Sequence, residues 1–105
     1  MTSKSRKQQI EEMLAEDPND SFLRYGLAME YAGLKQYQEA ARCLQDLISL
    51  DPGYVPAYFH AGKALLELNR LDEARAVLRS GIAVALRKGD AHAAGEMETL
   101  LDDIG

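Results

Sequence analysis

The side chains that most often carry enzymatic or metal chemistry are few in this sequence and stand apart from one another. The two histidines, His60 and His92, have no second histidine, cysteine or carboxylate at a spacing typical of a metal site. The single cysteine, Cys43, lies on an apolar stripe between Ala40 and Leu47, which favours a small packed side chain over a reactive thiol. We therefore expect neither a metal site nor a bound cofactor.

Two glutamates, Glu39 and Glu73, stand at equivalent places in the sequence and raise the question of paired catalytic carboxylates. Each lies in the first turn of an expected helix, where the helix dipole and free backbone N–H groups favour an acidic side chain. The chain has no glycine-rich phosphate loop, and no set of residues combines a nucleophile, a base and an oxyanion donor. The sequence therefore predicts a protein that is not an enzyme.

Composition and charge exclude several kinds of partner. The chain has 105 residues, enough for one domain, and a formal net charge of −5 at pH 7. An acidic chain lacks general electrostatic attraction to nucleic acid or to an anionic membrane. A lone cysteine forms no internal disulfide, and no run of about 20 apolar residues is present to span a membrane. We expect a cytoplasmic protein, with no nucleic acid and no membrane among its partners.

The elements that position these side chains follow from an internal repeat of 34 residues. When residues 21–54 are aligned on residues 55–88, five positions are identical, namely Leu34 and Leu68, Glu39 and Glu73, Ala40 and Ala74, Leu44 and Leu78, and Ile48 and Ile82. A fixed period of this size is typical of a stacked array, in which each unit buries its apolar face against its neighbours.

Apolar residues recur at helical spacing in six segments, and no segment alternates with a period of two. We predict an all-α fold with helices over residues 10–16, 37–50, 55–68, 71–87 and 91–103. A further helix begins after an N-cap at Asp20 or Ser21 and ends at a break marked by Gly33 and Lys35-Gln36. Proline after Asp17 and after Asp51 ends two of these helices, and Gly89 followed by Asp90 combines a C-terminal stop with an N-cap. The last helix should bury one stripe, made of Ala91, Ala94, Met97, Leu101 and Ile104.

The pattern resembles the tetratricopeptide repeat. Its first copy reads Tyr25-Gly26-Leu27-Ala28-x-x-Tyr31, then Tyr37-x-Glu39-Ala40, then Leu44-x-x-Leu47-Ile48-x-Leu50-Asp51-Pro52. The resemblance implies a right-handed superhelical stack of antiparallel helix pairs. It divides the chain into a flexible segment (1–9) and one domain (10–105) made of a half repeat (10–20), two repeats (21–54 and 55–88) and a capping helix (90–103).

Small residues stand where the paired helices would cross, namely Ala28, Ala40, Gly62 and Ala74. The second repeat departs from the first in two ways. Gly81 replaces Leu47, which would permit a closer helix contact. The pair Ala85–Leu86 replaces Asp51–Pro52, so we expect that helix to continue for about one more turn.

In this family the first helix of each pair lines a concave face that holds ligands. The resemblance therefore implies a non-catalytic module that binds a peptide or helix of another protein. The set of positions carried over is unusually apolar and aromatic for a face that solvent would otherwise cover, which is typical of an interaction site. The expected binding residues are Phe22, Tyr25, Met29, Phe59, Lys63, Leu66 and Glu67. The other reading of Phe22, Tyr25 and Phe59 is that adjoining helices cover them as core.

One subtype of the family holds the terminal carboxylate of chaperone tails with a lysine and two asparagines. Tyr25, Met29 and His60 occupy those places here, so a chaperone-tail receptor is not expected. Methionine and aromatic side chains suit an apolar helix or extended peptide instead, with Lys63 available to an acidic group of the partner. The alternative function is structural self-association, as a homodimer formed through the same apolar face or through the last helix.

Overall fold

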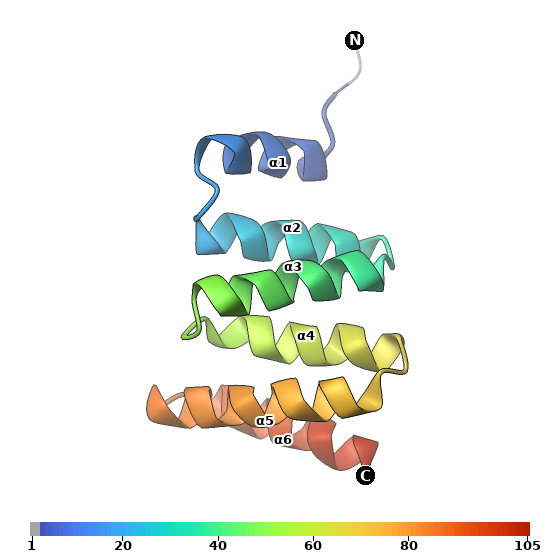
Figure 1. Ribbon diagram of the computed structural model, residues 1–105, viewed down its shortest axis with the longest axis vertical. Coiled ribbons are helices and arrows are strands. Elements are labelled where there is room, and N and C mark those ends of the chain that lie inside the picture. The colour runs from blue at the N-terminus through green and yellow to red at the C-terminus, as the bar shows by residue number, and fades with distance from the viewer. Residues whose placement is uncertain (1–2) are drawn as a thin grey trace.

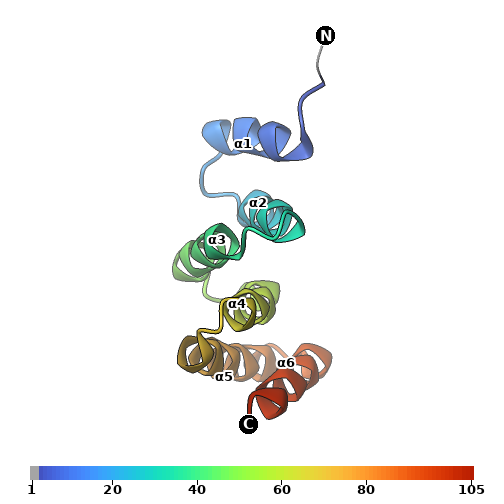
Figure 2. The ribbon, with the colours of Figure 1, turned by 90° about the vertical axis from the view of Figure 1, so that its right-hand side faces the viewer.

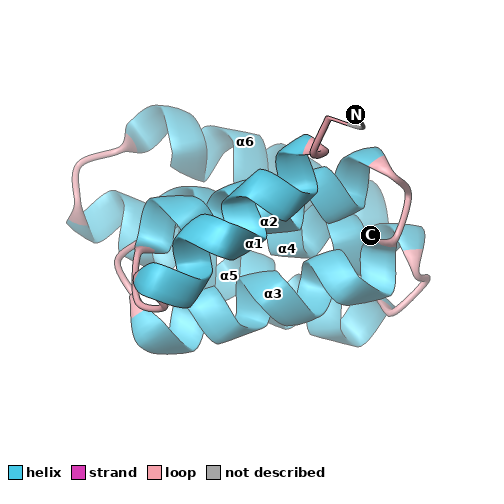
Figure 3. Ribbon diagram, turned by 90° about the horizontal axis from the view of Figure 1, so that it is seen from above, coloured by secondary structure: helices cyan, strands magenta, loops and turns pink. Residues whose placement is uncertain are grey.

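The computed structural model describes residues 3–105, which form six helices and no strand. The helices are α1 (Arg6–Glu16), α2 (Ser21–Gly33), α3 (Tyr37–Leu50), α4 (Val55–Glu67), α5 (Leu71–Arg87) and α6 (Ala91–Ile104). They lie one above another along the longest dimension of a molecule of 49 × 28 × 20 Å (Figure 1). Seen along that dimension, the described chain consists of helices joined by short loops (Figure 3). The predicted all-α class is confirmed.

The helices form two rows when the stack is seen from the side. One row contains α2, α4 and α6, and the other contains α3 and α5 (Figure 2). Each helix from α2 to α5 packs on the next helix in the chain, and α4 also reaches α6 directly. The first helix, α1, packs chiefly on α2. The helices at the two ends of the stack are therefore covered less than the helices between them.

The first helix begins earlier than the sequence predicted. Residues 1–9 were expected to be a flexible segment, but Arg6–Gln9 are helical, so that prediction is wrong for these four residues. The cause is a capping box at Ser5. The Ser5 hydroxyl accepts a hydrogen bond from the backbone N–H of Gln8, and the Gln8 side chain accepts one from the backbone N–H of Ser5. Residues 1–2 of the predicted segment lie outside the described residues.

The remaining helix ends agree closely with their sequence signals. Asp20 caps α2 by accepting a hydrogen bond from the backbone N–H of Leu23. The turn before α6 uses Gly89, whose φ of +75° favours glycine, and then Asp90, which accepts a hydrogen bond from the backbone N–H of Ala93. As predicted, α5 is longer than α3, with 17 residues against 14, because no Asp-Pro pair interrupts it.

The buried face of α6 differs from its predicted stripe. Ala94 and Met97 are buried as expected, but Ala91 is exposed at the start of the helix. Ala93 and Leu100 pack on the core beside them. Because α6 is the last helix of the stack, it contacts α4 and α5 from one side only. That contact, rather than the helical period, decides which residues α6 buries.

Candidate functional site

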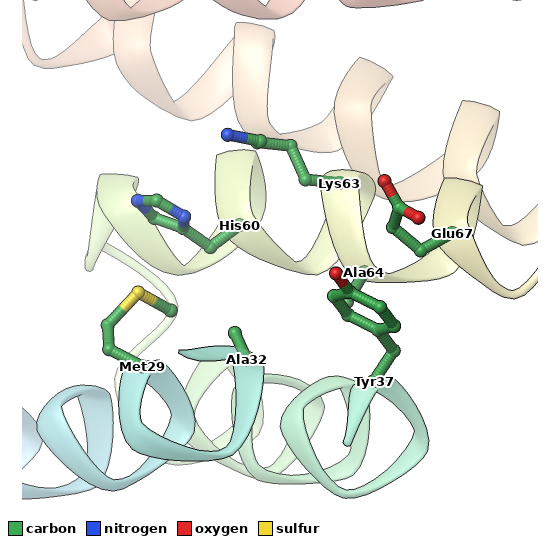
Figure 4. Close-up of a pocket in the computed structure, with 7 residues that line it drawn as sticks. All are labelled: Met29, Ala32, Tyr37, His60, Lys63, Ala64 and Glu67. Carbon is green, nitrogen blue, oxygen red and sulfur yellow. The ribbon is translucent and has the colours of Figure 1, made fainter. Parts of the chain in front are cut away.

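A cleft of about 280 Å³ opens between α2 and α4, on the side of the stack where these two helices and α6 lie. Figure 4 shows its two walls, with one set of side chains from α2 and the start of α3 and another from α4. The residues that line it are Met29, Ala32, Tyr37, His60, Lys63, Ala64 and Glu67. Its lining therefore combines apolar side chains with a polar group of three residues from α4.

Two further hollows adjoin this cleft along the same helices. One, of about 280 Å³, lies between α4 and α6 and includes Phe59 and His60. The other, of about 220 Å³, lies between α1 and α2 and includes Phe22 and Met29. His60 and Met29 each line two neighbouring hollows, so the three hollows adjoin one another from α1 to α6.

The structure distributes the seven predicted binding residues among these hollows. Met29, Lys63 and Glu67 line the cleft between α2 and α4. Phe22 and Tyr25 line the hollow between α1 and α2, and Phe59 lines the hollow between α4 and α6. Leu66 lines none of them. It is half-buried and packs on the core formed by residues such as Ala40, Leu65 and Ala74.

Tyr25 and Phe59 belong partly to the core, whereas Phe22 does not. Both rings are half-buried and pack on core clusters. His60 lies between them, with ring centroids 5.5 Å from Tyr25 and 5.1 Å from Phe59, both in edge-on geometry. Phe22 remains 70% exposed. The alternative prediction, that adjoining helices cover these aromatic residues as core, is therefore right in part for Tyr25 and Phe59 and wrong for Phe22.

Four residues of the central cleft were not among the predicted binding residues, namely Ala32, Tyr37, His60 and Ala64. Tyr37 begins α3, the second helix of its pair, and the family rule considered only first helices. The two alanines carry no recognisable functional signal, because small residues at helical spacing indicate packing. In the sequence, His60 was considered as a possible metal ligand and as the counterpart of an asparagine in the chaperone-tail subtype, yet it lies where two hollows meet.

Lys63 and Glu67 place opposite charges one helical turn apart at the edge of the cleft. The Lys63 side chain extends toward His60, so that its ammonium lies away from the Glu67 carboxylate (Figure 4). The Lys63 ammonium lies over the Phe59 ring, 5.3 Å from its centroid, which is a cation–π contact. Neither residue forms an ion pair within residues 3–105. Both charges are therefore available to a ligand.

The environment of His60 favours its neutral form. Burial lowers the pKa of His60, and the nearby ammonium of Lys63 lowers it further, whereas the carboxylate of Glu96 acts in the opposite direction. At pH 7 the centre of this surface therefore presents a neutral imidazole. Cys43 lies away from these hollows, and burial raises the pKa of its thiol, in agreement with a packing role.

We expect the protein to lose stability when the pH falls below about 6.5, the ordinary pKa of histidine. In the unfolded chain His60 binds a proton near that pH, whereas in the folded protein it does so only at lower pH. The unfolded state therefore holds more protons in this window, and the free energy of unfolding decreases as the pH falls. Urea unfolding between pH 7.5 and 5, at about half-unit steps, measures the change.

His60→Gln should flatten this pH dependence. His92→Gln is the matched control, because the His92 side chain is 88% exposed. If the wild-type protein and His60→Gln lose stability equally over this range, the pKa of His60 is not the cause.

The last helix does not offer the interface that self-association through Met97 would require. Met97 is fully buried, and a Cβ added to Gly81 would lie 2.5 Å from its sulfur. Leu101 is half-buried. A homodimer formed through the last helix therefore cannot use Met97 as a contact.

Within residues 3–105, no group of three or more histidine, cysteine or acidic residues is arranged to hold a metal ion. Over the same residues, every helix is too short or too polar to cross a membrane.

These features define a stack of antiparallel helix pairs with a hollowed side. Residues 31–95 match the family model of the tetratricopeptide repeat, and the chain belongs to this family. Its curated relatives include the TPR repeat-containing protein PA0015 of Pseudomonas aeruginosa, which is 34% identical over 92 residues, or 88% of each chain.

Solved structures with the same fold cover nearly the whole chain. Protein BPP2914 from Bordetella parapertussis has a TM-score of 0.85 and 28% identity over 97% of this chain and 89% of its own. A tetratricopeptide repeat domain protein from Salinibacter ruber has a TM-score of 0.77 and 32% identity over 83% of this chain and 88% of its own. The TPR2B domain of yeast Sti1, solved in a complex with pHsp70, has a TM-score of 0.88 at 21% identity, over 93% of this chain and 78% of its own.

Proposed function

We propose that this protein is a non-catalytic interaction module that holds a segment of a partner protein along α2, α4 and α6. The observation that carries the proposal is the pair of adjoining hollows that share His60, one on each side of α4. Membership of the tetratricopeptide repeat family supports a protein partner, and so does the complex that the Sti1 domain of the same fold forms with pHsp70. The lone cysteine and the acidic charge support a cytoplasmic setting.

The chemistry of the central cleft indicates what the segment should contain. Met29, Ala32 and Ala64 supply apolar surface for an apolar side chain, and methionine adapts readily to different shapes. The ammonium of Lys63, which lies over the Phe59 ring and forms no ion pair within residues 3–105, suits a neighbouring acidic residue. We therefore propose a segment in which an acidic residue follows or precedes an apolar one.

A chaperone-tail carboxylate is a poor match for this surface. The places of the lysine and asparagines of that subtype hold Tyr25, Met29 and His60, and the rings of Tyr25 and His60 are in contact. A carboxylate there would meet aromatic edges and a thioether rather than a cation. We propose that an apolar stretch of the partner lies at this point.

Selection from a displayed random peptide library tests this assignment. The selected peptides should be enriched in adjacent apolar and acidic residues. In fluorescence anisotropy, Lys63→Glu and Phe59→Ala should each weaken the best peptide about tenfold or more, because both variants alter the surface around His60. Arg79→Glu, an exposed position on α5 with the same change of net charge as Lys63→Glu, is the matched control.

Two outcomes would contradict the proposal. One is that no peptide is enriched, or that its affinity is unchanged in both variants. The other is a dimer whose population rises with concentration in light scattering and which Phe59→Ala abolishes. That result would assign the same surface to self-association instead.

A further inference from the structure

The face between α1 and α2 leaves apolar side chains uncovered at the end of the stack. Met13 is 47% exposed and Phe22 is 70% exposed. They line the hollow of about 220 Å³ together with Ile10, Leu23 and Tyr25. Exposed large apolar residues that gather around one hollow are typical of an interaction surface.

The internal repeat shows what covers the equivalent face elsewhere in this chain. Counted back by 34 residues, Leu44, Leu47 and Ala57 correspond to Ile10, Met13 and Leu23. Leu44, Leu47 and Ala57 are fully buried, because α2 lies over the face between α3 and α4. The residues of α2 that cover them are Tyr25, Ala28 and Met29. Within residues 3–105, no helix covers the face between α1 and α2 in the same way.

At one end of the face between α1 and α2 lies a carboxylate equivalent to the one that contacts the start of α2. At the start of α2, the Ser21 hydroxyl donates a hydrogen bond of 2.8 Å to the carboxylate of Asp51. The equivalent of Asp51 is Asp17, which is exposed and accepts no side-chain hydrogen bond within the described residues. A carboxylate at this place favours the positive end of a helix dipole.

At the other end of the face, basic residues stand where the equivalent face between α3 and α4 has small residues. Ala40 and Ala41 pack beside Tyr31 and Ala32 at the end of α2, and their equivalents are Arg6 and Lys7. Arg6 lies 3.5 Å from the carboxylate of Glu30, yet its side chain is 72% exposed, so its guanidinium can accept a second acidic partner. A cation here also favours the negative end of a helix dipole.

From these observations we propose that the face between α1 and α2 binds an amphipathic helix of a partner protein, which runs antiparallel to α1. This helix takes the position that α2 holds over α3 and α4. It carries apolar, small and apolar residues at i, i+3 and i+4, as α2 does at Tyr25, Ala28 and Met29. At i+7, the place of Ala32, it carries an acidic residue that meets Arg6. This surface adjoins the hollows that the proposed function uses, because Met29 lines both the hollow between α1 and α2 and the central cleft, whereas Ile10, Met13 and Arg6 line only the former.

A stapled helical peptide of about four turns is the probe. It carries Ser, Tyr, Ala, Met and Glu at the places equivalent to residues 21, 25, 28, 29 and 32, and Ala, Gln or Lys elsewhere. We expect saturable binding in fluorescence anisotropy and chemical-shift changes centred on Ile10 and Met13. Met13→Ser should weaken binding about tenfold, because it removes apolar surface from the contact. Leu86→Ser, at a residue of α5 that is 58% exposed, and Phe59→Ala should leave binding unchanged.

A charge swap keeps the test independent of folding defects. Arg6→Glu should weaken the peptide that carries glutamate and should restore affinity for a peptide with lysine at that place. The proposal is overturned if neither peptide binds, if Met13→Ser and the swap have no effect, or if light scattering shows a dimer that Met13→Ser abolishes. In the last case a second copy of this chain is the occupant. If the peptide library selection yields no ligand, or none that Lys63→Glu weakens, the results for the stapled helix are unaffected. The proposed function and the helix-binding face can therefore fail independently.

Discussion

Replacing Leu44 by alanine is expected to lower the free energy of unfolding by about 2–5 kcal/mol. Leu44 is fully buried and packs with Ala28 of α2 and with Ala57 and Ala61 of α4. Its fully buried neighbours across both interfaces are alanines, whose short side chains cannot reach into the space that the leucine leaves, while Tyr25 and Met29 pack on the edge of this cluster. The cavity therefore stays open, and the full loss of packing is felt.

Urea unfolding followed by circular dichroism measures this loss. The matched control is Leu86→Ala, because Leu86 is 58% exposed on α5 and should change the free energy of unfolding by about 0.5 kcal/mol or less. The interface at Leu44 joins the first repeat to the second, and repeats in a stack depend on their neighbours. Equal effects of the two substitutions would show that Leu44 does not hold this interface together.

Replacing Gly81 by alanine is expected to cost about 1–3 kcal/mol, because it overpacks the junction of three helices. An added Cβ would contact the Cβ of Tyr58 in α4 and lie 2.5 Å from the sulfur of Met97 in α6. In isolation, alanine is the better helix former by about 1 kcal/mol, so the expected sign depends entirely on this crowding. The result tests whether Gly81 permits the close approach that the sequence predicted.

Gly95→Ala in α6 is the matched control for Gly81→Ala. No atom other than its own helix and chain neighbours lies within 4 Å of a Cβ added at Gly95, so the substitution should be neutral or stabilising. Thermal and urea unfolding of both variants provide the comparison. If Gly81→Ala also stabilises the protein, the flexible side chain of Met97 has moved aside and the junction is looser than its geometry implies.

The helix boundaries were largely predictable because local chemistry sets them. The predicted bounds of α3 and α5 are correct. Asp51-Pro52 and Gly89 each end a helix that lies no more than a few residues before them in the sequence. The start of α1 was missed because its capping box lies in a polar stretch without an apolar stripe. Helical periodicity detects a buried face, and the first turn of α1 has none.

The composition of the hollowed face was predictable, whereas its exact membership was not. The repeat placed Met29 and Lys63 on first helices, and both line the central cleft. Leu66 was expected beside them but packs on the core instead. A rotation of one helix by a fraction of a turn decides between these two surroundings, and the 34-residue period does not specify that rotation. Tyr37 was missed for a different reason, because it belongs to a second helix and only first helices were expected to line the surface.

The sequence by itself determined the number of helices, their pairing and the places of closest approach, because caps, small residues and apolar spacing act over a few residues. Only the tertiary structure decided which side chains remain uncovered. Leu47 and Met13 occupy equivalent positions, yet Leu47 is fully buried and Met13 is 47% exposed. The physical reason is that burial depends on a neighbouring helix. An interior helix such as α3 has neighbours on both sides, whereas α1 has one chiefly in α2.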